Sequence, residues 1–188
     1  MLSLEIKCNW EAWTIHLSQC AYIDLILCHF HFDDLKPLSM PIDTSFQLTA
    51  EQAPASTAEH AIRHHVPYCK AVRALNWAAL ATCPNITFAI STIACFTSNP
   101  RPAHWEAVKQ IFHYLAGMCN LWLLYGETLQ ALEGYADTNS SMAKDRHAIT
   151  SYTFLTDGGA VSWFSKHQEI VSLSTTKSEY VTATYCMA

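Results

Sequence analysis

The sequence predicts an α+β fold, on three observations. Residues 2–17 alternate between apolar and polar side chains, as a β-hairpin does. Residues 66–117 repeat apolar side chains at helical spacing. After residue 129, three short apolar or β-branched runs precede a helix start, which indicates an antiparallel sheet followed by a helix. The 188 residues are 51% hydrophobic, enough to fill the core of one domain or of two small ones.

The first sixty residues predict a hairpin, a helix and a connector. Residues 2–10 and 13–17 form the hairpin, which turns at Glu11 and Ala12. Ser18 is expected to cap a helix over residues 19–30. Residues 36–54 are a polar connector that contains prolines. One face of the helix is apolar at i, i+3, i+4 and i+7 spacing, through Tyr22, Ile23, Ile26, Leu27 and Phe30.

The middle of the chain predicts three helices. The first covers residues 68–82. Pro84 opens the second, because proline suits the first helical position, and this helix runs to about residue 97. The third covers about residues 103–116 and is expected to end at Gly117.

The last third predicts three strands and a helix. The strands cover residues 132–136, 149–155 and 160–165, and a turn with two glycines joins the last two. Thr176 and Glu179 match a capping box, so a helix should start there. Asp137 then follows the first strand, and Glu179 lies in the first helical turn. By residue type alone, Asp137 is a turn residue at a strand end and Glu179 a helix-capping acid.

These motifs, taken together and in order, resemble the Pol polyprotein of copia-type retrotransposons, from the end of the reverse transcriptase domain through the N-terminal half of the ribonuclease H domain. The resemblance covers nearly the whole chain. In the opening block it rests on Leu2, Leu4, Glu5, Ile6, Ile15, Leu17, Ser18, Gln19, Tyr22, Ile23, Lys36, Pro37 and Pro41. In the middle it rests on Val66, Pro67, Tyr68, Ala81, Thr82, Pro84, Ile86, Ser98, Asn99, Pro100, His104, Trp105, Glu106, Ala107, Lys109, Tyr114 and Leu115. In the last third it rests on Gly134, Tyr135, Asp137, Ser151, Tyr152, Gly158, Gly159, Ser162, Trp163, Ser165, Lys166, Gln168, Leu173, Ser174, Thr175, Thr176, Glu179 and Tyr180.

The resemblance implies three parts. Residues 1–60 would be the C-terminal piece of reverse transcriptase, residues 61–128 a helical thumb- or connection-like region, and residues 129–188 a truncated ribonuclease H-like domain with an incomplete sheet. The parent proteins carry out RNA-directed DNA synthesis and cut the RNA strand of RNA–DNA hybrids.

The resemblance also implies a metal site. Ribonuclease H uses two Mg²⁺ ions held by carboxylates. Asp137 would bridge the metals and Glu179 would bind one of them. The chain contains neither the polymerase aspartates nor the later ribonuclease H aspartate of the family. We therefore expect weak or absent Mg²⁺ binding and no activity of the chain alone.

Charge and composition bear on partners and location. The resemblance implies an RNA–DNA hybrid as partner, which a protein binds through Lys and Arg contacts to the phosphates. The net charge is −5 and there are only 11 Lys and Arg residues, so the sequence shows no basic cluster for such contacts. The alternative is a non-enzymatic module that binds nucleic acid or a Pol partner. A third hypothesis is residual activity completed by another chain. The strand at 132–136 would leave an open edge that allows self-association.

The cysteines and apolar segments predict an intracellular protein with no membrane contact. The eight cysteines include no C-x-x-C pair, so we expect reduced core thiols such as Cys28 and Cys95, in the cytoplasm or the nucleus. No signal peptide is expected, and no apolar run approaches the length of a membrane span.

Overall fold

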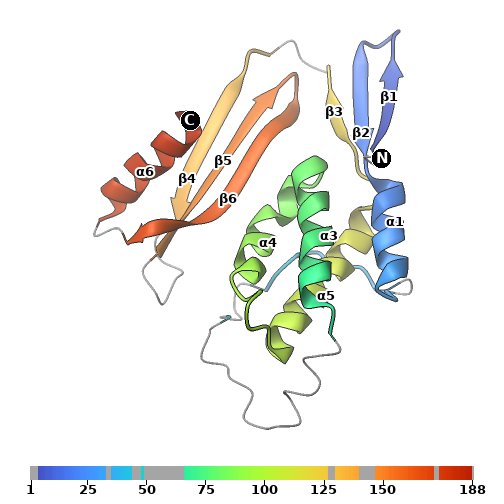
Figure 1. The fold of residues 1–188 in the computed structure, drawn as a ribbon. Coiled ribbons are helices and arrows are strands. Elements are labelled where there is room, and N and C mark those ends of the chain that lie inside the picture. The colour runs from blue at the N-terminus through green and yellow to red at the C-terminus, as the bar shows by residue number, and fades with distance from the viewer. Residues whose placement is uncertain are drawn as a thin grey trace. The chain divides into compact units, whose positions relative to one another are not determined.

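The computed structural model describes residues 4–32, 35–43, 48, 66–126, 130–139, 147–171 and 174–187. Contacts divide the chain into two compact units. Unit 1 contains residues 1–5 and 18–121, and unit 2 contains residues 6–17 and 122–188. Figure 1 shows the elements of both, which are described separately below.

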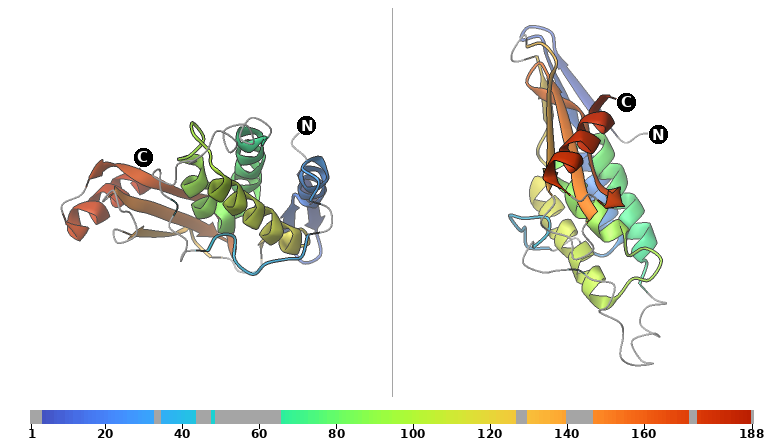
Figure 2. Two further views of the ribbon diagram at one scale, coloured as in Figure 1. Left: turned by 90° about the horizontal axis from the view of Figure 1, so that it is seen from below. Right: turned by 90° about the vertical axis from the view of Figure 1, so that its left-hand side faces the viewer.

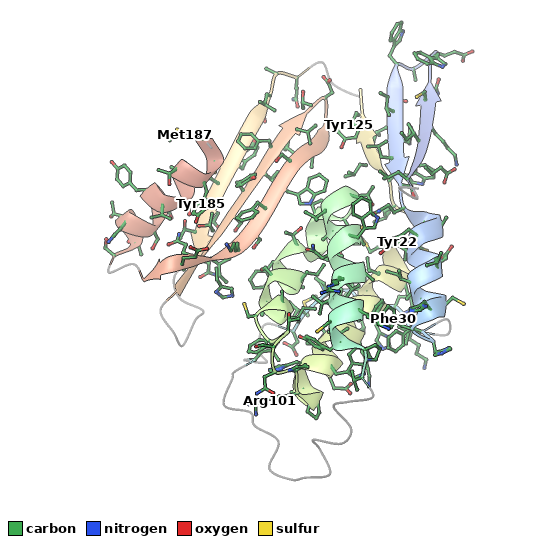
Figure 3. All side chains as sticks on the ribbon, viewed as in Figure 1. Tyr22, Phe30, Arg101, Tyr125, Tyr185 and Met187 are labelled. Atoms are coloured by element: carbon green, nitrogen blue, oxygen red, sulfur yellow. The ribbon has the colours of Figure 1, made fainter. Side chains whose placement is uncertain are left out.

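Unit 1 is a group of helices around one apolar core (Figure 1). Its elements are α1 (Cys20–His29), α3 (Tyr68–Ala81), the 3₁₀-helix η1 (Pro84–Ile86) that leads into α4 (Thr87–Ala94), and α5 (Pro102–Met118). The core consists of the apolar faces of these helices, which confirms the helical periodicity of the sequence. Among its fully buried side chains are Tyr68, Leu75, Ile86, Ile93, Ile111, Phe112 and Leu115. Phe30, labelled in Figure 3, packs on Phe112 with ring centroids 5.3 Å apart.

Two helix ends in unit 1 can be compared with the sequence. Pro84 opens the second predicted helix as expected, although its first turn is a 3₁₀-helix. The expectation that Gly117 ends the third helix is wrong, because α5 continues through Gly117 to Met118. A Cβ at Gly117 would lie 3.0 Å from the Cβ of Pro37. The glycine therefore allows close approach of the connector rather than a left-handed helix end.

The first sheet of unit 2 has the order β1-β2-β3, with β1 (Glu5–Asn9), β2 (Thr14–Ser18) and β3 (Leu123–Tyr125). The Oδ1 atom of Asn9 accepts hydrogen bonds from the N–H groups of Glu11 and Ala12, each at 3.1 Å. These bonds stabilise the turn at Glu11 and Ala12, the position predicted from the sequence. β3 was not expected. It pairs antiparallel with β2, His16 opposite Leu124.

The second sheet has the antiparallel order β4-β5-β6, with β4 (Glu133–Asn139), β5 (His147–Thr156) and β6 (Gly159–Val171), followed by α6 (Thr175–Met187). Asp157 and Gly158 turn the β5–β6 hairpin with φ of 48° and 83°. The helix α6 packs along β4 and β5, on one face of the sheet (Figure 2). The three predicted strands and the predicted helix are therefore present.

The α+β class is confirmed, and the three-part division at residues 60 and 128 remains a prediction.

One expectation about the thiols is wrong: Cys28 and Cys95 are exposed, and none of the eight cysteines is buried or in a disulfide. Both residues lie at or next to the last turn of a helix, α1 and α4, on the side turned to solvent. Within the described residues, no helix is long and apolar enough to span a membrane.

Candidate functional site

The face of the second sheet that α6 covers carries a buried polar cluster. Side chains alternate along strands, so Thr150 of β5 and Gln168 of β6 both point to this face, and their side chains are hydrogen-bonded at 2.9 Å. Gln168 Nε2 also donates to the carbonyl of Ser178 at 3.1 Å and to Thr182 Oγ1 at 3.3 Å, both on α6. The hydroxyls of Thr150 and Thr182 are hydrogen-bonded to each other at 3.0 Å. The cluster holds α6 to the sheet by direct hydrogen bonds.

The helix that carries Glu179 is capped by a serine. Lys177 donates its N–H to the hydroxyl of Ser174 at 3.3 Å, and Ser178 N–H donates to the Ser174 carbonyl at 3.2 Å. The helix begins at Thr175. The predicted capping box of Thr176 and Glu179 is therefore wrong, and Glu179 lies in the second helical turn instead of the first.

Thr138 of β4 also contacts α6, next to this polar cluster. Its hydroxyl donates to the Ser178 carbonyl at 3.4 Å and is hydrogen-bonded to the hydroxyl of Thr182. Asp137 and Glu179 are thus the sequence neighbours of two residues that touch, Thr138 and Ser178. The chain brings the two acidic positions to one end of the interface between β4 and α6.

The carboxylate of Asp137 does not share the covered face. The strand continues to Asn139, so Asp137 lies inside β4, opposite Ser151, rather than after its end. Alternation places it on the face turned away from Thr138, and it is exposed. On that face the hydroxyl of Tyr135 donates to Glu133 Oε2 at 2.9 Å, and this hydrogen bond raises the pKa of Tyr135.

Glu179 is also exposed. Ser178, Thr182 and Tyr185 of α6 contact the sheet and are spaced at i, i+4 and i+7. Tyr185, labelled in Figure 3, stacks on Phe164 with centroids 6.3 Å apart, and Phe164 stacks on Tyr152. Glu179 is one position past Ser178, at the margin of this contacting stripe.

The resemblance implies Mg²⁺ ions bound by Asp137 and Glu179. Two carboxylates are available: Asp137 is on the face of β4 turned away from Thr138, Glu179 is exposed on α6, and neither belongs to any group of three ligating side chains among the described residues. A two-metal site needs several carboxylates around both ions. Within this part of the chain, Asp137 and Glu179 alone do not fit a two-metal site.

The sequence did not point to Thr138, Thr150 or Thr182 as partners, and it named Gln168 only as a motif residue. Threonine and glutamine are usually exposed, so burial of Thr150, Gln168 and Thr182 is not a default expectation. The available signal is spacing. Ser178 and Thr182 are four residues apart, which places them on one face of a helix.

Comparison with known proteins gives a consistent group of relatives. The chain is 39% identical over 185 residues, 98% of its length, to the retrovirus-related Pol polyprotein from transposon TNT 1-94 of Nicotiana tabacum, of which it spans 14%. It is 31% identical over 169 residues to the Pol polyprotein from transposon RE1 of Arabidopsis thaliana, covering 88% of the chain and 11% of that protein. It is also 35% identical over 119 residues to a protein named secreted RxLR effector protein 161 of Plasmopara viticola, covering 62% of the chain and 84% of that protein. No family model and no solved structure matches the chain.

Proposed function

Because the chain belongs to the Pol polyproteins of copia-type retrotransposons, we propose that it is a piece of the reverse transcriptase and ribonuclease H region of such a polyprotein. In the parent, this region would serve RNA-directed DNA synthesis and cleavage of the RNA strand in hybrids. The proposal rests on the 39% identity, over 98% of the chain, to the Pol polyprotein from transposon TNT 1-94. The chain spans only 14% of that protein. The activity of the whole polyprotein is therefore part of the proposal.

The chain alone is proposed to be inactive on RNA–DNA hybrids. The observation that supports this is the position of the two family acids. Asp137 and Glu179 are exposed, Asp137 is on the face of β4 turned away from Thr138, and neither acid belongs to a group of three ligating side chains among the described residues. Phosphodiester hydrolysis by two metals needs both ions held in place to clamp the attacking and leaving oxygens.

Cleavage of a labelled RNA–DNA hybrid tests this proposal. The full chain is incubated in Mg²⁺ and, separately, in Mn²⁺, beside Asp137→Asn and Glu179→Gln. We expect all three proteins to give the same background. Both substitutions keep side-chain size at exposed positions, so the variants should fold. Turnover by the unmodified chain that Asp137→Asn abolishes would show that the chain is an active nuclease.

A second candidate is a non-enzymatic module that binds another segment of Pol. It is favoured by β4, which pairs only with β5 among the described strands and therefore presents an open row of backbone groups. Nucleic acid is the weaker partner, given the net charge of −5. A gel shift with a hybrid duplex at low salt separates the two partners. A shift that salt abolishes would favour nucleic acid, and no shift would leave the protein partner.

A further inference from the structure

Three ligating side chains converge in unit 1, on parts of the chain that sequence motifs do not connect. Cys20, Asp24 and Cys119 each offer one donor atom, and the three atoms lie within 4.8 Å of one another. Cys20 is the first residue of α1, Asp24 follows at i+4 on the same helix face, and Cys119 is the C-cap of α5. The helices α1 and α5 pack together, so the group lies at their junction.

The spacing of the donors suits a small tetrahedral ion. Zinc binds thiolates at about 2.3 Å and carboxylate oxygens at about 2.0–2.2 Å. A sulfur and an oxygen on one tetrahedral zinc are therefore about 3.6 Å apart, and two sulfurs about 3.8 Å. The observed distance from Cys20 Sγ to Asp24 Oδ2 is 3.8 Å. Small side-chain rotations would bring all three donors to bonding distance.

The donor chemistry selects the ion. Two sulfurs and one carboxylate are unsuited to Mg²⁺ or Ca²⁺, which prefer oxygen, and they suit Zn²⁺. We propose that Cys20, Asp24 and Cys119 form a binding site for a Zn²⁺ ion, with a water molecule as the fourth ligand. Three protein ligands and one open position are an established zinc arrangement. This site is independent of the proposed function, since it shares no residue with the β4–α6 contact.

Protonation should control binding. Burial raises the pKa of the Cys20 thiol, and the neighbouring Asp24 carboxylate and Cys119 raise it further. Without a cation, a thiolate beside the carboxylate is unfavourable, so Zn²⁺ must displace protons from the thiols.

Cobalt substitution gives the direct test. The full chain is reduced, stripped of metal by a chelator and titrated with Co²⁺, then with Zn²⁺. We expect one Co²⁺ per chain, a thiolate-to-cobalt charge-transfer band, the visible bands of tetrahedral cobalt, and loss of all of these when Zn²⁺ is added. Zn²⁺ should also raise the melting temperature, because it binds the folded state.

Variants show which residues hold the ion. Cys20→Ser and Cys119→Ser should each weaken the charge-transfer band, and Asp24→Asn should weaken Zn²⁺ binding at least about tenfold, since even partners outside the coordination shell cost about 10–100-fold. Cys28→Ser is the matched control, an exposed thiol on the same helix. Asp24→Asn changes an exposed side chain and should keep the circular dichroism spectrum of the native chain.

Three results would overturn the proposal. One is a Co²⁺ titration of the reduced chain with no thiolate band. Another is equal metal binding by the native chain and a Cys20→Ser, Cys119→Ser double variant, which would place the ion on other cysteines. The third is a Cys20–Cys119 disulfide in the unreduced chain, found by peptide mapping, together with no metal binding after reduction.

Discussion

The hydroxyl of Tyr68 in α3 donates a 2.7 Å hydrogen bond to the carbonyl of Ile93 in α4. Tyr68 is 2% exposed, and burial raises its pKa far above the ordinary value, so the hydroxyl stays protonated at any pH where the protein is studied. The bond joins the two helices in the middle of the unit 1 core. The same carbonyl also accepts the backbone N–H of Phe96 at 3.1 Å, so the Tyr68 hydroxyl is a second donor to it.

Tyr68→Phe should lower the stability of unit 1 by about 1–2 kcal/mol, because it leaves the buried Ile93 carbonyl without this partner. Hydrogen exchange of α3 and α4 peptides, measured by mass spectrometry, reports the change. Tyr22→Phe is the control. Its hydroxyl also donates to a backbone carbonyl, that of Ala74 at 3.1 Å, but it is only half-buried and should matter less. Equal effects of the two variants would contradict the ranking.

Thr182→Val should loosen α6 from the second sheet. The substitution keeps the side-chain shape but removes a hydroxyl bonded to Thr138, Thr150 and Gln168. Leaving such buried groups without partners costs about 1–3 kcal/mol. Exchange of α6 amides should become faster, whereas Thr182→Ser, which keeps the hydroxyl, should stay closer to the native chain. A valine variant as protected as the serine variant would show that the polar cluster does not hold the helix.

Gly126→Ala should destabilise unit 2. Gly126 has φ of +100°, and an added Cβ would lie 2.1 Å from the carbonyl oxygen of Trp13. Its N–H donates to the Asp157 carbonyl at 2.9 Å, so it links the end of β3 to the β5–β6 turn. The backbone strain alone is worth about 1–3 kcal/mol.

Urea unfolding with exchange of β5 and β6 peptides measures the Gly126 effect. The control is Gly117→Ala, a helical glycine at ordinary φ whose added Cβ would lie 3.0 Å from the Cβ of Pro37, so that a small shift of the connector is its cost. Unit 1 should tolerate that change better, because alanine favours a helix by about 1 kcal/mol over glycine. Equal destabilisation by both substitutions would argue against a special role for the positive φ.

The open edge of β4 should make the chain self-associate. Tyr135 is 59% exposed on this strand, and Tyr135→Lys would place a charge on the edge, which disfavours strand-to-strand pairing. Sedimentation velocity over a concentration series should show less association for this variant. Tyr180→Lys is the control, since Tyr180 is 72% exposed on α6, away from the strand. A monomeric native chain, or the same loss in both variants, would refute the idea.

Local patterns were enough to place most elements. Apolar spacing predicted α3 and α5 to within two residues, and the Asp157-Gly158 turn predicted the β5–β6 hairpin, because these signals depend on near neighbours. β3 was missed because three residues are too few to show alternation, and its strand identity comes from pairing with β2.

The candidate sites depend on contacts that local patterns do not contain. The motif located Asp137 and Glu179, but whether their carboxylates meet depends on which face of β4 turns to α6, and only the contacts of Thr138 with α6 show that face. The convergence of Cys119 on Cys20 and Asp24 needs α5 to end beside the start of α1. The Cys20–Asp24 spacing was visible, but it is common in helices and predicted nothing alone.

The pairing of β2 with β3 has a consequence for synthesis. The helices of unit 1 all lie between these strands in sequence, so the hairpin of β1 and β2 leaves the ribosome long before the strand that completes its sheet. A two-stranded hairpin is marginal by itself, and closing so long a loop is slow. The exposed Trp10 and Trp13 at its tip would meanwhile be open to chaperones or to non-specific association. Unit 1 can finish folding as the chain emerges, whereas unit 2 must wait for the C-terminal third.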